Sequence, residues 1–327
     1  MRHLFRRIGF YLVALWASIT ITFIIPRLSP INPAEALIAR FQGKLRPEAL
    51  HSLEIAFGVS HDPLWVQYVQ YLNQLMHGNL GVSITYSATP VTTVIAQGLP
   101  WTLLLATISV VISFAVGTLL GVVVAWRRGS ALDTTVPPLL TFFSAVPYFW
   151  LALILLYVLG FLLNWFPITG GYDIGVTVGL TPDFIVSAIY HSILPAITLI
   201  IGSVAGWVLG MRNAMITTLS EDYVLMAEAK GLPERQVMFG YAARNAILPN
   251  VTGFALALGF VVAGQLVTEI VFSYPGIGFR LLQAVANQDY ALIQGIFLVI
   301  ACAVLAANFL ADLLYTALDP RVRQGRG

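Results

Sequence analysis

The sequence predicts an all-α integral membrane protein in which six transmembrane helices cross the bilayer and both termini lie in the cytoplasm. Of its 327 residues, 58% are hydrophobic and 10% are charged, and the mean hydropathy is +0.83. Several apolar stretches reach the roughly 18 residues that a helix needs to cross a hydrocarbon core of about 30 Å. These stretches are continuous rather than alternating, which favours helices over membrane-spanning strands.

The apolar stretches define a single transmembrane domain over residues 1–327, because no linker, low-complexity run or internal repeat divides the chain. The N-terminal stretch also has the basic start of a cleavable signal peptide. Its apolar run is long, however, and Arg27 and three prolines separate it from the small residues at 34–36, so a retained first helix is favoured. The expected spans are 8–26, 99–126, 136–163, 185–211, 250–272 and 290–316.

The basic residues set the expected orientation. With the N-terminus in the cytoplasm, the inner segments hold most of the 17 basic residues, as the positive-inside rule requires. These inner residues are Arg2, Arg6, Arg7, Arg127, Arg128, Arg212, Lys230, Arg235, Arg244, Arg321, Arg323 and Arg326. The net charge of +2 gives no argument for a nucleic-acid partner.

The extracytoplasmic loop expected at 27–98 has the pattern of two short helices. The first is expected at 46–58 and the second at 62–78, with Asp62 as its cap, Pro63 at its first position and Gly78 as its stop. Aromatic residues recur along the second helix at 65, 68 and 71. We expect them at the membrane surface, although they could also face a substrate-binding protein.

The sequence contains no recognisable catalytic or metal-binding motif. It lacks the Gly-rich phosphate loop that ends in Gly-Lys-Ser/Thr, the Gly-x-Ser-x-Gly elbow and the His-Glu-x-x-His pair. Its five histidines do not have metal-ligand spacing, and Cys302 is the single cysteine. Few ionisable residues lie within the spans, whereas a pump or proton relay usually needs more. We therefore expect no catalytic site, metal or cofactor in this chain, and an energy supply from another subunit.

One polar segment interrupts the apolar chain at 212–249, between the fourth and fifth spans. A helix is expected from Glu221 to Lys230 with Ser220 as its cap, and Gly231 is suited to end it in a left-handed conformation. Pro233 suits the first turn of a second helix that runs to about Asn245. Such a segment could dock the energy-supplying subunit or lie on the membrane as a plain amphipathic loop. The apolar contact face expected for docking is Met226, Leu232, Val237 and Met238.

Six stretches, in order along almost the whole chain, resemble the permease subunits of ABC importers for peptides, opines and nickel, and among them the dipeptide/oligopeptide first-permease type. They are RLSPINP, LWVQYVQYLNQLMHGNLGVS, VPYFWLALILLYVLGFLLNWFPITGG, DYVLMAEAKGLPERQVMFGYAARNAILPNVT, VFSYPGIG and DYALIQGIFLVIACAVLAANFLADLLYTALDPRVR. The resemblance implies a type I ABC importer fold in a bacterial or archaeal cytoplasmic membrane. It also implies a second homologous permease, two ATP-binding subunits that carry ATP and Mg²⁺, and an extracytoplasmic substrate-binding protein.

The fourth stretch is similar to the EAA loop, the segment through which this family couples to its ATPase. Ala227 matches the second Ala of that motif and Gly231 its central Gly, whereas Leu225 and Met226 replace its Glu and first Ala. The residues that the resemblance assigns to coupling are Ala227, Glu228, Ala229, Lys230, Gly231, Leu232, Pro233, Leu248 and Pro249.

Small residues repeat every four positions in three of the expected spans, a pattern that lets helix backbones approach closely in lipid. The glycines expected to pack helices are Gly202, Gly206, Gly210, Gly117, Gly121 and Gly259. Pro147 and Pro195 are expected to kink the third and fourth spans.

The substrate is the least determined property. A peptide is favoured, an oligosaccharide is next because the spans are rich in aromatic residues, and nickel or glutathione is possible within the same family. A stand-alone channel or carrier is the alternative from another class, and a membrane-embedded enzyme has no set of residues to support it.

Overall fold

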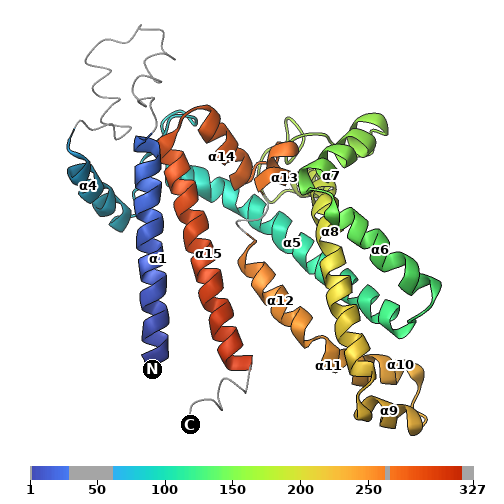
Figure 1. Ribbon diagram of the computed structural model, residues 1–327. Coiled ribbons are helices and arrows are strands. Elements are labelled where there is room, and N and C mark those ends of the chain that lie inside the picture. The colour runs from blue at the N-terminus through green and yellow to red at the C-terminus, as the bar shows by residue number, and fades with distance from the viewer. Residues whose placement is uncertain (1, 29–61, 262–265, 319–327) are drawn as a thin grey trace. The chain divides into compact units, whose positions relative to one another are not determined.

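The computed structural model describes residues 2–28, 62–261 and 266–318, and these are mostly helical (Figure 1). The short helix expected at 46–58 lies outside the described residues. The chain forms two compact units that divide at residues 102/103, 274/275 and 309/310. The first unit therefore joins the N-terminal segment to a late segment of the chain, and the second unit contains the polar segment at 212–249.

The first unit is built from helices at the two ends of the sequence. Its elements are α1 (Arg2–Arg27), α4 (Leu64–Met76), β1 (Val82–Ser83), β2 (Thr89–Pro90), the start of α5 (Val91–Trp126), α14 (Ile277–Ala286) and most of α15 (Tyr290–Leu318). Helices α1 and α15 run side by side (Figure 1). The side-chain amide of Gln294 donates to the carbonyl oxygen of Thr22 at 3.2 Å, and the rings of Tyr11 and Phe309 meet edge to face.

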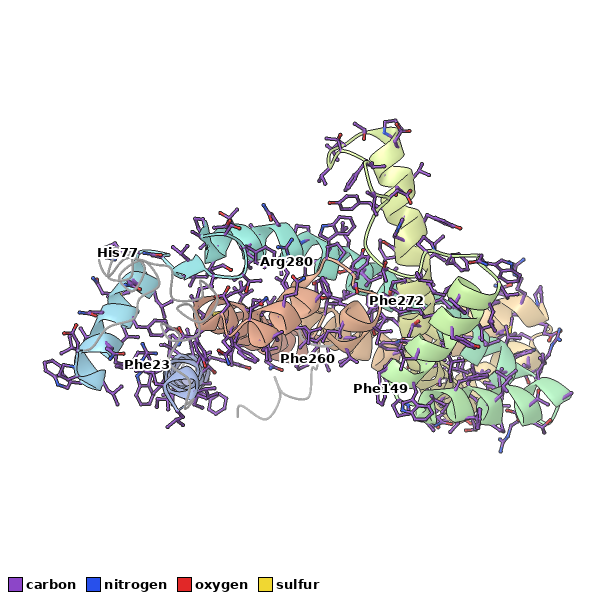
Figure 2. All side chains as sticks on the ribbon, turned by 90° about the horizontal axis from the view of Figure 1, so that it is seen from above. Phe23, His77, Phe149, Phe260, Phe272 and Arg280 are labelled. Atoms are coloured by element: carbon purple, nitrogen blue, oxygen red, sulfur yellow. The ribbon has the colours of Figure 1, made fainter. Side chains whose placement is uncertain are left out.

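Helix α4 packs on the last turns of α1, close to the labelled Phe23 in Figure 2. Tyr68 makes a 2.7 Å hydrogen bond with Thr20, and the rings of Tyr68 and Tyr71 both contact Phe23. Tyr68 and Tyr71 thus pack on α1. The expected place of this aromatic row at the membrane surface stays a prediction. Trp65 is 71% exposed.

The start of α4 differs from the expected cap by one residue. Pro63 is the N-cap and His77 the C-cap, so the helix begins at Leu64. Asp62 does not cap the backbone; its carboxylate accepts a hydrogen bond from the side chain of Gln70 at 3.3 Å. Gly78 follows with a φ of +70°, which is consistent with its expected role as a stop.

A short antiparallel hairpin and an apolar core complete the first unit. Val82 pairs with Pro90 and Ser83 with Thr89. Asp289 is fully buried beside this hairpin, and its carboxylate accepts hydrogen bonds from the Ser83 hydroxyl and the Thr85 amide. The core beneath joins the start of α5 to α14 and α15 through Val91, Val94, Ile95, Ile277, Ala284, Leu292 and Ile296.

The second unit is centred on α8 (Pro182–Leu219), a helix of 38 residues. Helices α6 (Ala131–Ala145), α7 (Tyr148–Leu155), α12 (Leu248–Gly259) and α13 (Leu266–Val271) all pack against it. A π-helix, η1 (Leu156–Leu162), continues α7. The polar segment forms α9 (Asp222–Ala229), α10 (Glu234–Gln236), the π-helix η2 (Val237–Ala243) and α11 (Arg244–Ala246).

Three helices of the described chain are long and apolar enough to cross a membrane: α5, α8 and the Tyr290–Leu310 part of α15. A fourth span results if α6 and α7–η1 are counted together. The apolar parts of α1 (Gly9–Ile25) and α12 are shorter. By length and composition, the described chain thus has three or four segments that can cross a membrane. The six-span topology with cytoplasmic termini stays a prediction.

The third expected span, 136–163, is not one straight helix. It consists of α6 and α7–η1, which meet at an angle of 97°. The break falls at Val146, which is extended with a ψ of 126°, and at Pro147, the N-cap of α7. Proline lacks a backbone donor and pushes the preceding residue out of the helical region, so this site ends a helix rather than kinking it. By contrast, α8 continues through Pro195.

The fifth expected span, 250–272, also contains more than one helix. Helix α12 ends at Gly259 and α13 begins at Leu266, while residues 262–265 lie outside the described part. Helix α14 follows and was not expected from the sequence.

Candidate coupling site

The polar segment is a pair of short helices that follow the C-terminal end of α8 (Figure 1). The sequence of α9 is rich in helix formers and has Asp222 in its first turn, where a negative charge complements the helix dipole. We had expected Ser220 to be its cap, and this is wrong. Glu221 takes the N-cap position, and the Ser220 hydroxyl donates instead to the Thr217 carbonyl oxygen at 2.8 Å.

Helix α9 ends in a Schellman motif, the reciprocal pair of backbone hydrogen bonds that closes a helix on a left-handed residue. Gly231 has a φ of +69°, and its amide donates to the Glu228 carbonyl oxygen at 2.8 Å. The Leu232 amide donates to the Ala227 carbonyl oxygen at 3.4 Å. The expected left-handed conformation of Gly231 is confirmed.

The second helix starts one residue later than expected. Pro233 is the N-cap of α10, so Glu234 is the first helical residue. Helix α10, η2 and α11 then follow one another as far as Ala246, close to the end expected at Asn245. Leu248 and Pro249 open α12, with proline in the first turn, where its missing amide costs nothing.

One face of the segment is buried against the ends of α5 and α8. The two transmembrane helices contribute Val122 and Ala125 from α5 and Met211 and Met215 from α8. The segment contributes Val224, Ala227, Val237, Ala242, Ala243 and Ala246. These small side chains allow the short helices to lie close to the transmembrane helices, so the segment is held in one position by this apolar core.

The expected apolar contact face is largely wrong. Val237 is 1% exposed, and Leu232 and Met238 pack against the same core, so of the four residues only Met226 is exposed. The apolar residues that the segment does present outward are Tyr223, Leu225, Met226, Phe239 and Tyr241. Sequence reasoning missed most of them because neither the register of α9 nor the π-helical turns of η2 could be predicted.

The nine residues assigned to coupling by resemblance fall into three groups. Ala227 is 2% exposed and packs inward, so it supports the segment from within. Leu232 is half-buried beside the same core. The exposed residues are Glu228, Ala229, Lys230, Gly231 and Pro233 at the turn, and Leu248 and Pro249 at the start of α12.

Two polar contacts that the sequence did not indicate fix the surroundings of the segment. The indole N–H of Trp126, the last residue of α5, donates to the carboxylate of Glu234. Arg212 Nε donates to Asp133 Oδ1 at 2.7 Å and so joins α8 to the first turn of α6. This bond and one from the Gly129 amide hold the pKa of Asp133 below its ordinary value.

The glycines expected to pack helices do not form one continuous ridge. A Cβ at Gly117 would lie 2.5 Å from Trp207 Cβ, and one at Gly121 would lie 2.7 Å from the Val208 carbonyl oxygen, so α5 and α8 are in close contact. Gly202 lies against the ring of Tyr148 and Gly210 against Asn250, whereas nothing lies within 4 Å of a Cβ at Gly206. Gly259 is half-buried at the end of α12.

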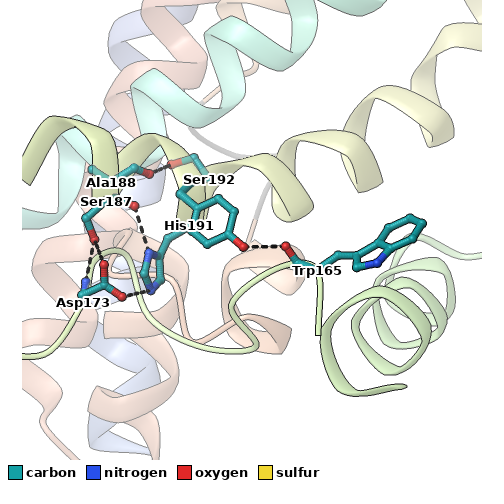
Figure 3. A network of polar contacts seen from close by, with 7 residues as sticks. Trp165, Asp173, Ser187, Ala188, His191 and Ser192 are labelled. Atoms are coloured by element: carbon teal, nitrogen blue, oxygen red, sulfur yellow. Dashed lines mark hydrogen bonds and ion pairs between the residues drawn. The ribbon is translucent and has the colours of Figure 1, made fainter. Parts of the chain in front are cut away.

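A polar cluster at the other end of α8 fastens the preceding loop (Figure 3). The Ser187 hydroxyl donates to Asp173 Oδ2 at 2.7 Å, and His191 Nε2 lies 3.9 Å from Asp173 Oδ1. The Tyr190 hydroxyl donates to the Trp165 carbonyl oxygen at 2.6 Å. Among the described residues, no group of three His, Cys, Asp or Glu side chains could hold a metal ion.

The described residues thus place a folded polar segment against the ends of two long apolar helices, as in a helical membrane protein. Comparison with known proteins identifies its family. Residues 117–324 match the family described as binding-protein-dependent transport system inner membrane component. The chain belongs to this family.

Characterised relatives match the chain over nearly its full length. It is 36% identical to the di/tripeptide transport system permease protein DppB of Pseudomonas aeruginosa, with 98% of each chain covered. It is 34% identical to the oligopeptide transport system permease protein AppB of Bacillus subtilis, over 92% of this chain and 93% of that one. It is 32% identical to the dipeptide transport system permease protein DppB of Escherichia coli K12, with 99% of each covered. The resemblance to the dipeptide/oligopeptide permease type is thus confirmed.

Proposed function

We propose that this chain is the transmembrane permease subunit of an ATP-driven, binding-protein-dependent importer of di- and oligopeptides. It forms half of the translocation pathway in a bacterial or archaeal cytoplasmic membrane, with both termini inside. Its partners are a second, homologous permease, two ATP-binding subunits and an extracytoplasmic binding protein. ATP and Mg²⁺ bind to the ATP-binding subunits, and this chain hydrolyses no ATP.

The observation that carries the proposal is the way in which the segment α9–α11 packs on α5 and α8. Its inner face packs on the ends of α5 and α8, and its outer face presents Tyr223, Leu225 and Met226 beside charged residues. A partner that binds this outer face can therefore displace two transmembrane helices at once. Exposed apolar side chains with a polar surround are typical of a protein-binding surface. The names of the relatives support peptides as the substrate.

Reconstitution tests the proposal. The chain is purified with its partner subunits, inserted in proteoliposomes and supplied with the binding protein, ATP and radiolabelled alanyl-alanine or a tripeptide. We expect uptake that requires ATP and stops when the phosphate-loop lysine of the ATP-binding subunits is replaced. The isolated chain should show no ATP hydrolysis.

Three outcomes would contradict the proposal in whole or in part. Steady ATP hydrolysis by the isolated chain would refute its role as a transport subunit that depends on a separate ATPase. ATP-independent flux through the chain alone would support a channel or carrier. Uptake of an oligosaccharide in place of peptides would support the role as an importer subunit and contradict the peptide substrate.

A further inference from the structure

The C-terminal residue of α5 and the first residue of α10 are joined by a side-chain hydrogen bond. The Trp126 indole N–H donates to Glu234, directly after the Gly231–Pro233 turn. We propose that this bond is the link through which movement of the turn is passed to α5, and that Trp126 and Glu234 are positioning residues for coupling. The inference rests on the proposed function, because it assumes that a partner moves the turn.

The apolar core between the segment and the ends of α5 and α8 cannot by itself specify a direction of movement. Contacts such as those of Val224, Ala227 and Val237 with Met211 and Met215 are non-directional and tolerate small shifts. A hydrogen bond requires a defined distance and angle between its two groups. Within residues 62–261, Trp126–Glu234 is the one side-chain hydrogen bond that joins α9–α11 to α5. It therefore transmits a displacement that the apolar contacts would partly absorb.

The helix that receives the displacement is in tight contact with α8. At Gly121 an added Cβ would lie 2.7 Å from the Val208 carbonyl oxygen and 2.8 Å from Met211 Cβ. Gly117 is equally close to Trp207 one turn earlier. Backbones this close leave no space for α5 to tilt independently of α8. A pull on Trp126 is consequently shared by both helices.

The chemistry of the pair allows the bond to be removed and restored. Trp126→Phe removes the N–H donor and keeps an aromatic ring, and Glu234→Ala removes the acceptor. Glu234→Gln loses the charge but keeps a side-chain oxygen that accepts a hydrogen bond. The loss of one such hydrogen bond changes the equilibrium constant between two states that differ by this bond about three- to tenfold.

The test compares these variants in the reconstituted complex, with alanyl-alanine as the transported probe. We expect Trp126→Phe and Glu234→Ala each to lower the peptide taken up per ATP hydrolysed by about three- to tenfold. The double variant should be no worse than either single variant, and Glu234→Gln should stay close to the parent. A merely structural role would lower the amount of permease in the membrane without changing the transport ratio.

Several outcomes would overturn the link. Normal uptake per ATP in Trp126→Phe and Glu234→Ala would do so, as would additive effects in the double variant. If the parent complex takes up no peptide at all, the proposed function fails instead. Thermal unfolding of the isolated chain, of Trp126→Phe, of Glu234→Ala and of the double variant then decides whether the bond forms. A coupling energy of zero in this double-mutant cycle also overturns the link.

Discussion

Gly210 of α8 and Asn250 of α12 are in direct contact: a Cβ at Gly210 would lie 2.7 Å from Asn250 Oδ1. The side-chain Nδ2 of Asn250 donates to the Trp207 carbonyl oxygen at 3.0 Å and to Thr118 Oγ1 at 3.2 Å. One buried side chain thus joins α5, α8 and α12 where the chain leaves the coupling segment. The small residue at 210 provides the space that this side chain occupies.

Asn250→Ala should destabilise the protein, because it removes both interhelical hydrogen bonds. Each such bond in a membrane protein contributes about 0.6–2 kcal/mol, so the free energy of unfolding should fall by roughly 1–3 kcal/mol. Thermal unfolding in detergent measures the change. Thr252→Ala is the matched control, since Thr252 is half-buried on the same helix and its hydroxyl donates to the Leu248 carbonyl oxygen of that helix at 3.0 Å. Equal midpoints for both variants would show that the Asn250 bonds contribute nothing.

Gly202 and Gly206 lie one turn apart on α8 and should respond differently to the same substitution. Gly202→Ala inserts a methyl group into the ring of Tyr148, and overpacking of this kind costs about 1–3 kcal/mol. Gly206→Ala meets nothing within 4 Å and should be neutral, or stabilising by up to about 1 kcal/mol through helix propensity. Thermal unfolding of the two purified variants compares them. An equal change in stability for the two variants would mean that the Tyr148 ring moves aside and that its contact with Gly202 sets no cost.

Much of the fold follows from local signals in the sequence. Continuous apolar runs predicted α5, α8 and α15, because length and composition alone decide whether a helix can cross a bilayer. Gly231 was correctly placed in the left-handed region, because a glycine after a helix-forming run is a local capping signal.

The features that were missed depend on the tertiary structure. Pro195 lies inside α8 whereas Pro147 ends a helix at a 97° bend, and nothing local distinguishes the two residues. Trp126 and Glu234 are 108 positions apart, so the sequence carried no sign of their contact. Whether Val237 faced a partner or the core depended on how the segment sits on α5 and α8.

The Arg212–Asp133 pair should make stability depend on pH. The depressed pKa of Asp133 means that its carboxylate stabilises the folded state above its unfolded pKa of about 3.9, and that this contribution is lost as pH falls through the folded pKa. Asp133→Asn should therefore lower the thermal midpoint at pH 7, and the difference from the parent should shrink below about pH 4. Asp183→Asn, at an exposed aspartate on the same helix as Arg212, is the control. A difference that persists unchanged at low pH would assign the effect to packing.

Gly231→Val should uncouple the permease from its ATPase partner while leaving membrane insertion intact. Gly231 has a φ of +69° and closes the Schellman motif after α9, and a β-branched residue held there is strained by about 1–3 kcal/mol. The Cβ itself meets nothing within 4 Å, so the cost arises from the backbone. Gly231→Asn is the matched control, because asparagine tolerates this conformation. In the reconstituted complex we expect peptide-stimulated ATP hydrolysis to be lost with valine and largely kept with asparagine. Normal stimulation with valine would show that the turn takes no part in coupling.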